Sequence, residues 1–191
     1  MVERVYCVAT AAFPEPSEAV LPLSPPLYQL LLEAGEFLSR SKVETDERWR
    51  QIIPYAVVTS GRRVLLVERL QDGSEARLHN RLSIGLGGHV NPIKHANARD
   101  LLEGGLAREL QEELVIGAYV AEAVGLIHSR DDPVSRVHTG LLYRVRTPGE
   151  VDVRETDKLS GMLTDWEAVG HQREQLESWS RMAYDFLNGR I

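Results

Sequence analysis

The stretch that decides the fold is Arg108-Glu109-Leu110-Gln111-Glu112-Glu113-Leu114, which follows Gly87-Gly88-His89-Val90 after a polar interval. Its residues are mostly helix formers, and on a helix Glu109, Glu112 and Glu113 lie on one face at the i, i+3 and i+4 spacing. Carboxylates gathered on one face repel one another, and a bound divalent cation would relieve that repulsion. The stretch therefore predicts a helix that binds a metal ion.

The same helix has an apolar stripe beside its glutamates. The stripe consists of leucines at every fourth position: Leu102, Leu106, Leu110 and Leu114. It predicts that the helix packs on a sheet, with the glutamates at the edge of the packed surface. Gly105 lies one turn before Glu109, and a glycine inside a helix costs about 1 kcal/mol relative to alanine. Either its missing side chain lets a metal-bound phosphate or the Gly87-Gly88 backbone come close, or the Gly104-Gly105 pair packs tightly against another element.

The segment before the helix has strand patterns. Residues 52–59 and 64–69 are apolar runs separated by Ser60-Gly61-Arg62, which predicts a hairpin. Residues 82–90 form a glycine-rich extended segment, and its glycines indicate that something approaches the backbone closely. Asp100 to Glu103 has the character of a capping box, with an acid at the N-cap of the long helix.

The rest of the chain adds an extension at one end and strands with a helix at the other. Residues 1–50 are predicted to form a strand over 5–13, a helix from Pro26 through Leu38, and a charged, exposed stretch from Arg40 to Arg50. Strands are expected over 121–128 and 139–146, joined by a polar loop, and an amphipathic helix over 171–188. Trp166 and Trp179 are expected in the core. This order is not a regular βαβα alternation, so it favours an α/β (α+β) fold with a mixed sheet over a doubly wound parallel sheet.

Composition restricts the classes of partner. A length of 191 residues suits one domain with an embellishment, and the net charge of -6 argues against binding to long nucleic acid. Cys7 is the single cysteine, which fits a reducing compartment, and no stretch approaches the roughly 20 apolar residues of a membrane span. We therefore expect a cytoplasmic protein that does not enter a membrane.

The two quoted segments resemble the signature of the Nudix hydrolases. That signature has Gly, five residues, Glu, seven residues, and then Arg-Glu-apolar-x-Glu-Glu-x-Gly-apolar, and its second half matches from Arg108 to Glu113, with Ile116 in the closing apolar position. Asp100 stands where the first Glu belongs, and Val115 replaces the late Gly, whose role in the turn Gly117 is a candidate to take. Gly88 precedes Asp100 by twelve positions where the signature has six, which indicates an insertion over about 91–97.

The resemblance implies an α/β/α sandwich with a mixed β-sheet and a central catalytic helix over residues 51–191, preceded by the extension 1–50. The Leu-Gly-Gly-His form and the Ile53-Pro54-Tyr55 lead-in are also similar to bacterial Nudix proteins described as predicted phosphoesterases. Members hydrolyse a pyrophosphate bond in a nucleoside diphosphate derivative or nucleotide with Mg²⁺ or Mn²⁺. Carried over, the resemblance implies four catalytic residues and adds the Gly88 carbonyl to the metal ligands Glu109, Glu112 and Glu113. The implied catalytic residues are Arg108, Glu109, Glu112 and Glu113. In this set Arg108 orients the glutamates by an ion pair.

Several roles stay open at this level. The general base is either a glutamate of the signature or a later acid, for which the candidates are Glu150, Glu155, Asp157 and Glu167. Candidate substrate-binding residues are Arg69, Arg77, Arg81 and His89, although each is equally explained as a surface arginine or, for His89, by structural hydrogen bonding. His128 and His138 are expected to be structural or to lie at a pocket rim. Dimerisation, which would make the chain a homodimer, and a lid over the site are two roles open to residues 1–50.

Two other functions compete with hydrolysis. A catalytically silent Nudix-like domain could sense a nucleotide by binding it, but a pure binder has no need of all three glutamates. An isopentenyl diphosphate isomerase has the same fold, yet its reaction uses a cysteine near the glycine strand, and residues 82–90 contain none. We therefore expect an enzyme acting on a small nucleotide substrate.

Overall fold

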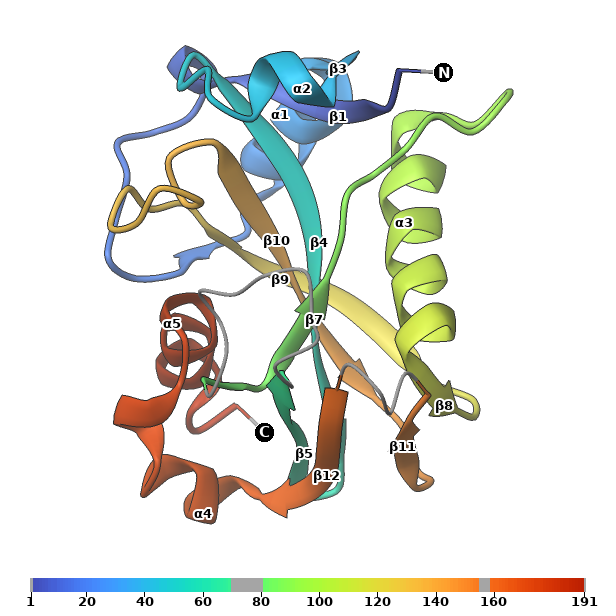
Figure 1. The fold of residues 1–191 in the computed structure, drawn as a ribbon, viewed down its shortest axis with the longest axis vertical. Coiled ribbons are helices and arrows are strands. Elements are labelled where there is room, and N and C mark those ends of the chain that lie inside the picture. Colours follow the sequence, from blue (N-terminus) through green and yellow to red (C-terminus); the bar gives the residue numbers. More distant parts are fainter. Residues whose placement is uncertain (1, 70–80, 155–158, 191) are drawn as a thin grey trace. The chain divides into compact units, whose positions relative to one another are not determined.

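The computed structural model describes residues 2–69, 81–154 and 159–190 (Figure 1). Its helices and strands follow one another in this order: β1 (Arg4–Ala9), β2 (Leu21–Pro22), α1 (Pro25–Glu33), β3 (Gly35–Ser39), α2 (Arg40–Val43), β4 (Trp49–Ser60), β5 (Arg63–Arg69), β6 (Leu82–Ser83), β7 (Gly85–Gly87), α3 (Ala98–Glu113), β8 (Leu114–Ile116), β9 (Val120–Ile127), β10 (His138–Arg146), β11 (Val151–Val153), β12 (Leu159–Asp165), α4 (Trp166–Gly170) and α5 (Ser178–Leu187). Short 3-10 turns cover Thr10–Ala12 and Arg173–Gln175. The expected α+β class is confirmed.

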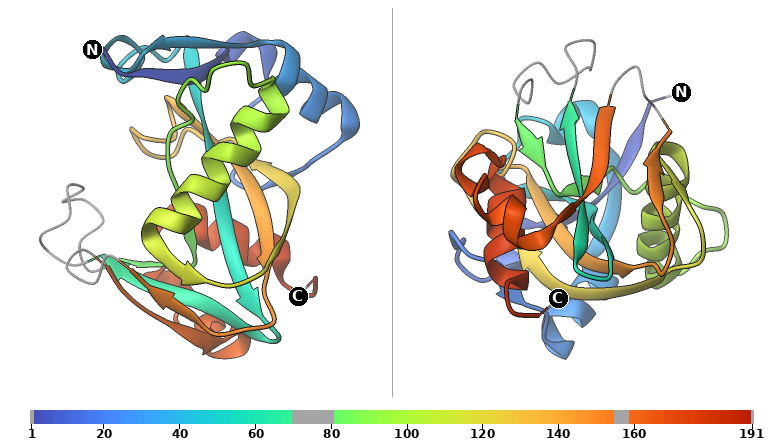
Figure 2. Two further views of the ribbon diagram at one scale, coloured as in Figure 1. Left: turned by 90° about the vertical axis from the view of Figure 1, so that its right-hand side faces the viewer. Right: turned by 90° about the horizontal axis from the view of Figure 1, so that it is seen from below.

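The chain forms two compact units. The first contains Met1–Tyr55, Gly87–Ala107 and Ala123–Leu142, and the second contains Ala56–Leu86, Arg108–Glu122 and Tyr143–Ile191. The elements α3, β4, β7, β9 and β10 each have residues in both units. The helix α3 is continuous in each view (Figure 2).

In the first unit, the N-terminal strand β1 lies between two partners. It pairs antiparallel with β3, from Arg4 opposite Ser39 to Val8 opposite Gly35, and with the start of β4, where Cys7 is opposite Gln51. The short β2 pairs with β9. The strand predicted over 5–13 is therefore present, but it ends at Ala9.

The helix predicted from Pro26 through Leu38 was too long. It ends at Glu33, and β3 begins at Gly35. A Cβ atom on Gly35 would stand 2.0 Å from Cζ of Tyr6, so a glycine is required where β3 crosses that ring. The Tyr6 hydroxyl donates to the Leu31 carbonyl at 2.8 Å, which holds the end of α1 against β1. Pairing with β1 thus overrides the apolar helical pattern at Leu38.

The charged stretch from Arg40 to Arg50 is exposed at most positions, but the prediction was wrong for Arg50. This side chain is completely buried at the start of β4. The strand is buried on both faces here, since its neighbours Gln51 and Ile52 are fully buried as well. The position of Arg50 in a strand that is covered on both faces therefore decides its burial, despite its charge.

In the second unit, the predicted hairpin is confirmed. Thr59 of β4 is opposite Val64 of β5, and Gly61 in the tight turn has a φ of +59°, a value that favours glycine. The strand β12 pairs with β5 along its whole length, from Leu159 opposite Arg69 to Asp165 opposite Arg63. The sequence pattern did not predict β12, because its residues alternate poorly.

The C-terminal helix begins later than predicted. Residues 171–177 include a 3-10 turn, and α5 starts at Ser178, where the Glu177 carboxylate accepts hydrogen bonds from the backbone of Trp179 and Ser180. The expected core positions of the tryptophans are confirmed, since Trp166 and Trp179 are both buried. Among the helices described, none combines the length and the apolar character needed to cross a membrane.

Candidate active site

The first turn of α3 is capped by two neighbouring side chains. The Asn97 side chain accepts from the backbone N–H of Asp100 at 3.0 Å, and the Asp100 carboxylate accepts from the backbone N–H of Asn97 at 3.4 Å. This is a reciprocal capping box in which Asn97 is the cap. The prediction that placed an acid at the cap was therefore wrong by three positions. Glu103 instead lies 3.7 Å from Arg99, one turn away.

The glycines of α3 are explained by packing. A Cβ atom on Gly105 would lie 3.1 Å from Cγ2 of Val90 and 3.5 Å from Cγ of Pro54, and one on Gly104 would lie 3.2 Å from Cδ1 of Ile93. These are tight van der Waals distances, and all of these residues belong to the first unit. Of the two explanations open from the sequence, close packing of the glycine pair is the one confirmed.

The predicted close approach to the glycine segment is also confirmed. A Cβ atom on Gly87 would stand 2.6 Å from the Pro54 carbonyl oxygen, because β7 pairs with β4 there. The group that approaches the backbone at this position is a neighbouring strand. Any larger residue would push β7 away from β4 and move the residues that follow it.

The glutamates of α3 differ in their exposure. The leucine stripe is buried as predicted, at Leu102, Leu106, Leu110 and Leu114. Next to it, the Glu109 side chain is only 13% exposed, whereas that of Glu112 is 58% exposed. Glu113 is half-buried, and its Oε2 has less than 1 Å² of exposed surface. The solvent exposure of the carboxylates therefore ranges from the sheltered Glu109 to the solvated Glu112.

Arg108 pairs with two of these carboxylates. Its Nη2 lies 2.6 Å from Oε1 of Glu109, and its Nε lies 3.8 Å from Oε2 of Glu112. The guanidinium offsets part of the repulsion between the acids and restrains the Glu109 side chain. In the described part of the chain, no group of three or more His, Cys, Asp or Glu side chains is arranged to hold a metal ion. The chemistry of the donor set nevertheless fits Mg²⁺ or Mn²⁺, which prefer carboxylate and carbonyl oxygens.

The chain does not end α3 with the glycine of the signature. Helix α3 stops at Glu113, and Leu114–Ile116 continue directly as β8, in which Val115 pairs with Asp152 of β11. Val115 is therefore a strand residue, and Gly117 follows the strand. A left-handed glycine at this helix end is not required, because the backbone enters β8 at once.

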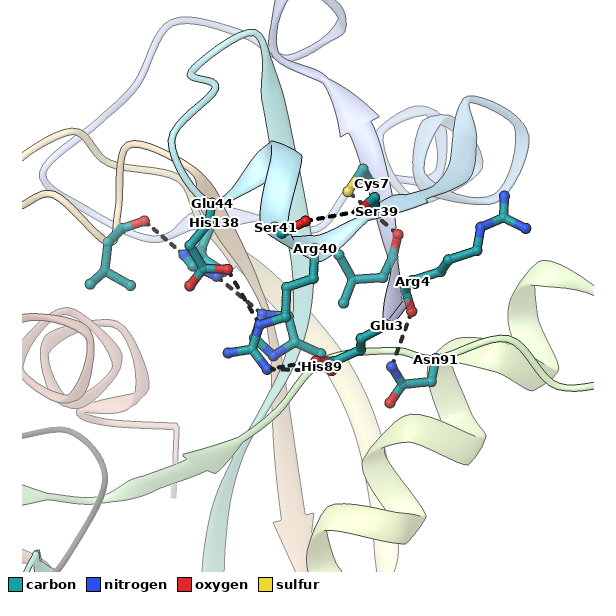
Figure 3. Close-up of polar contacts among 12 residues, drawn as sticks. Glu3, Arg4, Cys7, Ser39, Arg40, Ser41, Glu44, His89, Asn91 and His138 are labelled. Atoms are coloured by element: carbon teal, nitrogen blue, oxygen red, sulfur yellow. Dashed lines mark hydrogen bonds and ion pairs between the residues drawn. The ribbon is translucent and has the colours of Figure 1, made fainter. Parts of the chain in front are cut away.

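Two of the candidate substrate-binding residues, Arg69 and Arg81, flank a strand pair in which Glu68 of β5 is opposite Leu82 of β6. Arg69 ends β5, where its backbone pairs with Leu159, and Arg81 is exposed before β6. Arg77 lies outside the described residues. His89 directly follows Gly88 in the first unit, and its Nε2 is 3.3 Å from Nε2 of His138 (Figure 3). The structure therefore shows a structural contact for His89, one of the two explanations open from the sequence.

His128 and His138 are both buried. His138 Nδ1 lies 2.9 Å from the Val134 carbonyl oxygen, and His128 Nδ1 lies 2.9 Å from the Thr139 hydroxyl. The His128 ring stacks on Phe13 with centroids 4.8 Å apart. Burial lowers the pKa of His128 to about 4, with smaller contributions from nearby Arg50 and Arg130. His128 is therefore neutral at physiological pH.

Two of the later acids form ion pairs on the surface. Glu150 lies 2.7 Å from Arg63, and Glu167 lies 2.6 Å from Arg62. The hydrogen bond from Arg63 holds the pKa of Glu150 below its usual value. Glu155 and Asp157 lie outside the described residues. The two described acids among the four later candidates for the base are thus paired with arginines of the β4–β5 hairpin.

Comparison with known proteins places the chain in a family. No family model matches it. Protein YmaB of Bacillus subtilis (strain 168) is 37% identical over 161 residues, which cover 78% of this chain and 77% of that protein. The crystal structure of Tm1382, assigned as a Nudix hydrolase, has 32% sequence identity and a TM-score of 0.86, and the match covers 99% of this chain and 100% of that chain.

A third similarity is weak. The E. coli dihydroneopterin triphosphate pyrophosphohydrolase has 17% identity and a TM-score of 0.45, over 73% of this chain and 96% of that chain. It supports no inference by itself. The nearly complete match to Tm1382 agrees with the expected fold. The chain therefore belongs to the Nudix superfamily and is a hydrolase of pyrophosphate bonds.

Proposed function

We propose that this hydrolase cleaves the pyrophosphate bond of a nucleoside diphosphate derivative or nucleotide with the help of Mg²⁺ or Mn²⁺. The observation that carries the proposal is the surface of α3, where three carboxylates of graded exposure lie beside the buried leucine stripe. Arg108 contacts two of them. Such a surface is suited to a hard cation, which needs fixed oxygen ligands and keeps several waters.

The proposed ligands are Glu109, Glu112 and Glu113, with the carbonyl of Gly88 as an additional one by resemblance to the family. A bound cation would neutralise charge on the pyrophosphate and activate a water molecule. The chain supplies the orientation of these ligands. Glu109 is sheltered and held by Arg108, so its carboxylate is already ordered and loses little freedom when it binds.

The general base is best assigned to a glutamate of α3. A carboxylate whose pKa is held low is a weaker base, and Arg63 has that effect on Glu150. The Glu167 side chain is 73% exposed to solvent at its ion pair with Arg62. Glu113, with one oxygen sheltered from bulk water, is the more suitable candidate among the described acids.

We assign substrate binding to Arg69, Arg77, Arg81 and His89, on the chemistry of the side chains. Arginines bind phosphate oxygens through two parallel N–H donors, and three of them flank or lie within residues 69–81. The cytoplasm is the proposed compartment, because Cys7 is the single cysteine. Burial raises the pKa of the Cys7 thiol to about 12, so this residue is unsuited to isomerase chemistry.

The experiment that tests the proposal is hydrolysis of a panel of substrates. The purified protein is incubated with Mg²⁺ or Mn²⁺ and with nucleoside diphosphate sugars, dinucleoside polyphosphates and nucleoside triphosphates, and products are separated by chromatography. We expect cleavage of at least one compound, which EDTA abolishes. Tight binding of a nucleotide without cleavage would favour the sensor function instead, and metal-independent cleavage would contradict the metal assignment.

A further inference from the structure

The segment Gly87-Gly88-His89-Val90-Asn91 is held at several points within the first unit. The backbone N–H of Tyr6 donates to the Val90 carbonyl at 2.9 Å. Figure 3 shows that the Asn91 side chain donates to the Arg4 carbonyl, at 3.1 Å. At the other end, Gly87 lies against the backbone of β4. The N-terminal strand and β4 therefore restrain the backbone on both sides of Gly88 and His89.

His89 is held by its side chain. A carbonyl oxygen can only accept a hydrogen bond, so the Nδ1 of His138 carries a proton toward Val134. A neutral His138 then presents an unprotonated Nε2, and His89 donates to it from its own Nε2 at 3.3 Å (Figure 3). The tautomers are thus assigned from the hydrogen-bond network. This hydrogen bond holds the His89 ring with its Nε2 directed at His138.

His138 is in turn held by Arg50. The Nη1 of Arg50 donates to the carbonyls of Ser129, Ser135 and His138, which ties both ends of the 129–138 loop to β4. No described carboxylate forms an ion pair with this fully buried guanidinium, although the charge of Glu47 stabilises it from farther away. Burial lowers the pKa of Arg50 to about 10, so it remains charged at neutral pH. A buried charge without an acid in direct contact is costly, which favours a specific role for the contacts that it makes.

We propose that His138 is a positioning residue that fixes His89, with Arg50 holding the loop that carries His138, so that the neighbouring Gly88 carbonyl keeps one orientation. The inference rests on the proposed function, because it takes Gly88 to be a metal ligand. Residues that hold a metal ligand in place without contacting the metal change metal affinity by about 10–100-fold when they are replaced. The inference therefore predicts that metal affinity depends on the side chain of His138, which is 49 residues from His89 in the sequence.

The test compares three variants by calorimetric titration with Mn²⁺. His138→Phe keeps an aromatic ring but removes the acceptor for His89, whereas His138→Gln restores an acceptor near the position of Nε2. His128→Phe is the matched control, since it replaces another buried histidine joined to the same loop, with Thr139 and Phe13 as its contacts. Thermal unfolding of each variant shows whether it folds.

We expect His138→Phe to weaken Mn²⁺ binding about tenfold or more, and His138→Gln to restore most of the affinity, while His128→Phe binds as the parent does. The Mg²⁺ concentration for half-maximal hydrolysis should shift in parallel, with a smaller change in turnover at saturating metal. Unchanged Mn²⁺ affinity in folded His138→Phe would overturn the inference and leave the proposed function intact. Equal losses in the Phe and Gln variants would overturn it as well. A parent protein that binds no Mn²⁺ would reject both.

Discussion

The Asn97 side chain and the Asp100 backbone are joined by a 3.0 Å hydrogen bond, and the Asp100 carboxylate returns a contact to the Asn97 N–H. Asp100 occupies the position of the first glutamate of the Nudix signature, yet here its carboxylate closes the first turn of α3. We predict that Asn97→Ala lowers the free energy of unfolding by about 1 kcal/mol, measured by denaturant unfolding. Asn97→Ser, which keeps a capping oxygen, should lose much less. Equal losses would show that the side-chain cap contributes nothing.

A second prediction concerns Gly105 and Val90. An added side chain at Gly105 would meet Val90 at close range, so the usual gain on replacing a helical glycine is opposed by overpacking. Gly105→Val should lower the free energy of unfolding by about 1–3 kcal/mol. In the double variant with Val90→Ala the two losses should not add, because the smaller neighbour makes room. Strict additivity in this double-mutant cycle would contradict the packing explanation.

The limits of prediction from sequence follow from the range of the interactions involved. The hairpin at Gly61 and the leucine stripe of α3 depend on neighbours within a few residues, and both were predicted. The end of α1, the strand β3 and the burial of Arg50 depend on partners that lie far away in the chain. No local pattern contains the contact between Tyr6 and Gly35, or the strand β5 beside β12.

The same distinction applies to the site. The helical spacing of Glu109, Glu112 and Glu113 is visible in the sequence, as is their neighbour Arg108. The contact between His89 and His138 is not, since it depends on how the first unit folds. Strand parity could not have identified Arg50 as buried, because residues on both faces of β4 are buried. The division of the chain at residue 50 stays a prediction.

A third prediction concerns pH and His128. Burial lowers its folded pKa to about 4, from 6.5, so the unfolded chain binds the proton more tightly than the folded one. Stability from this group is therefore fully present above pH 6.5 and is lost as pH falls toward 4. The free energy of unfolding should fall by about 3 kcal/mol at most. Denaturant unfolding at a series of pH values measures this loss.

The variant His128→Phe should flatten that part of the stability profile. Phe13→Leu is the matched control, because it removes the ring stacked on His128 and leaves the imidazole in place. We expect this control to lower stability at every pH and to retain the slope between pH 6.5 and 4. A slope that survives in His128→Phe would assign it to other groups.

A fourth prediction concerns Arg108. Arg108→Lys keeps the charge but loses the planar guanidinium that reaches both Glu109 and Glu112. We expect metal-dependent hydrolysis to fall about tenfold, with the free energy of unfolding nearly unchanged. Arg99→Lys is the control, since Arg99 pairs with Glu103 on the same helix and contacts none of the proposed ligands. Equal effects in the two variants would mean that Arg108 contributes only to the surface charge.

The central claim, that the carboxylates of α3 hold the metal ion for hydrolysis, is tested most directly by one comparison. Glu113→Gln and Glu103→Gln remove one negative charge each from the same helix, and Mn²⁺ affinity and hydrolysis rate are measured for both. We predict that Glu113→Gln lowers the rate about 100-fold or more and weakens Mn²⁺ binding, whereas Glu103→Gln behaves as the parent. A folded Glu113→Gln protein with parental rate and metal affinity would contradict the claim.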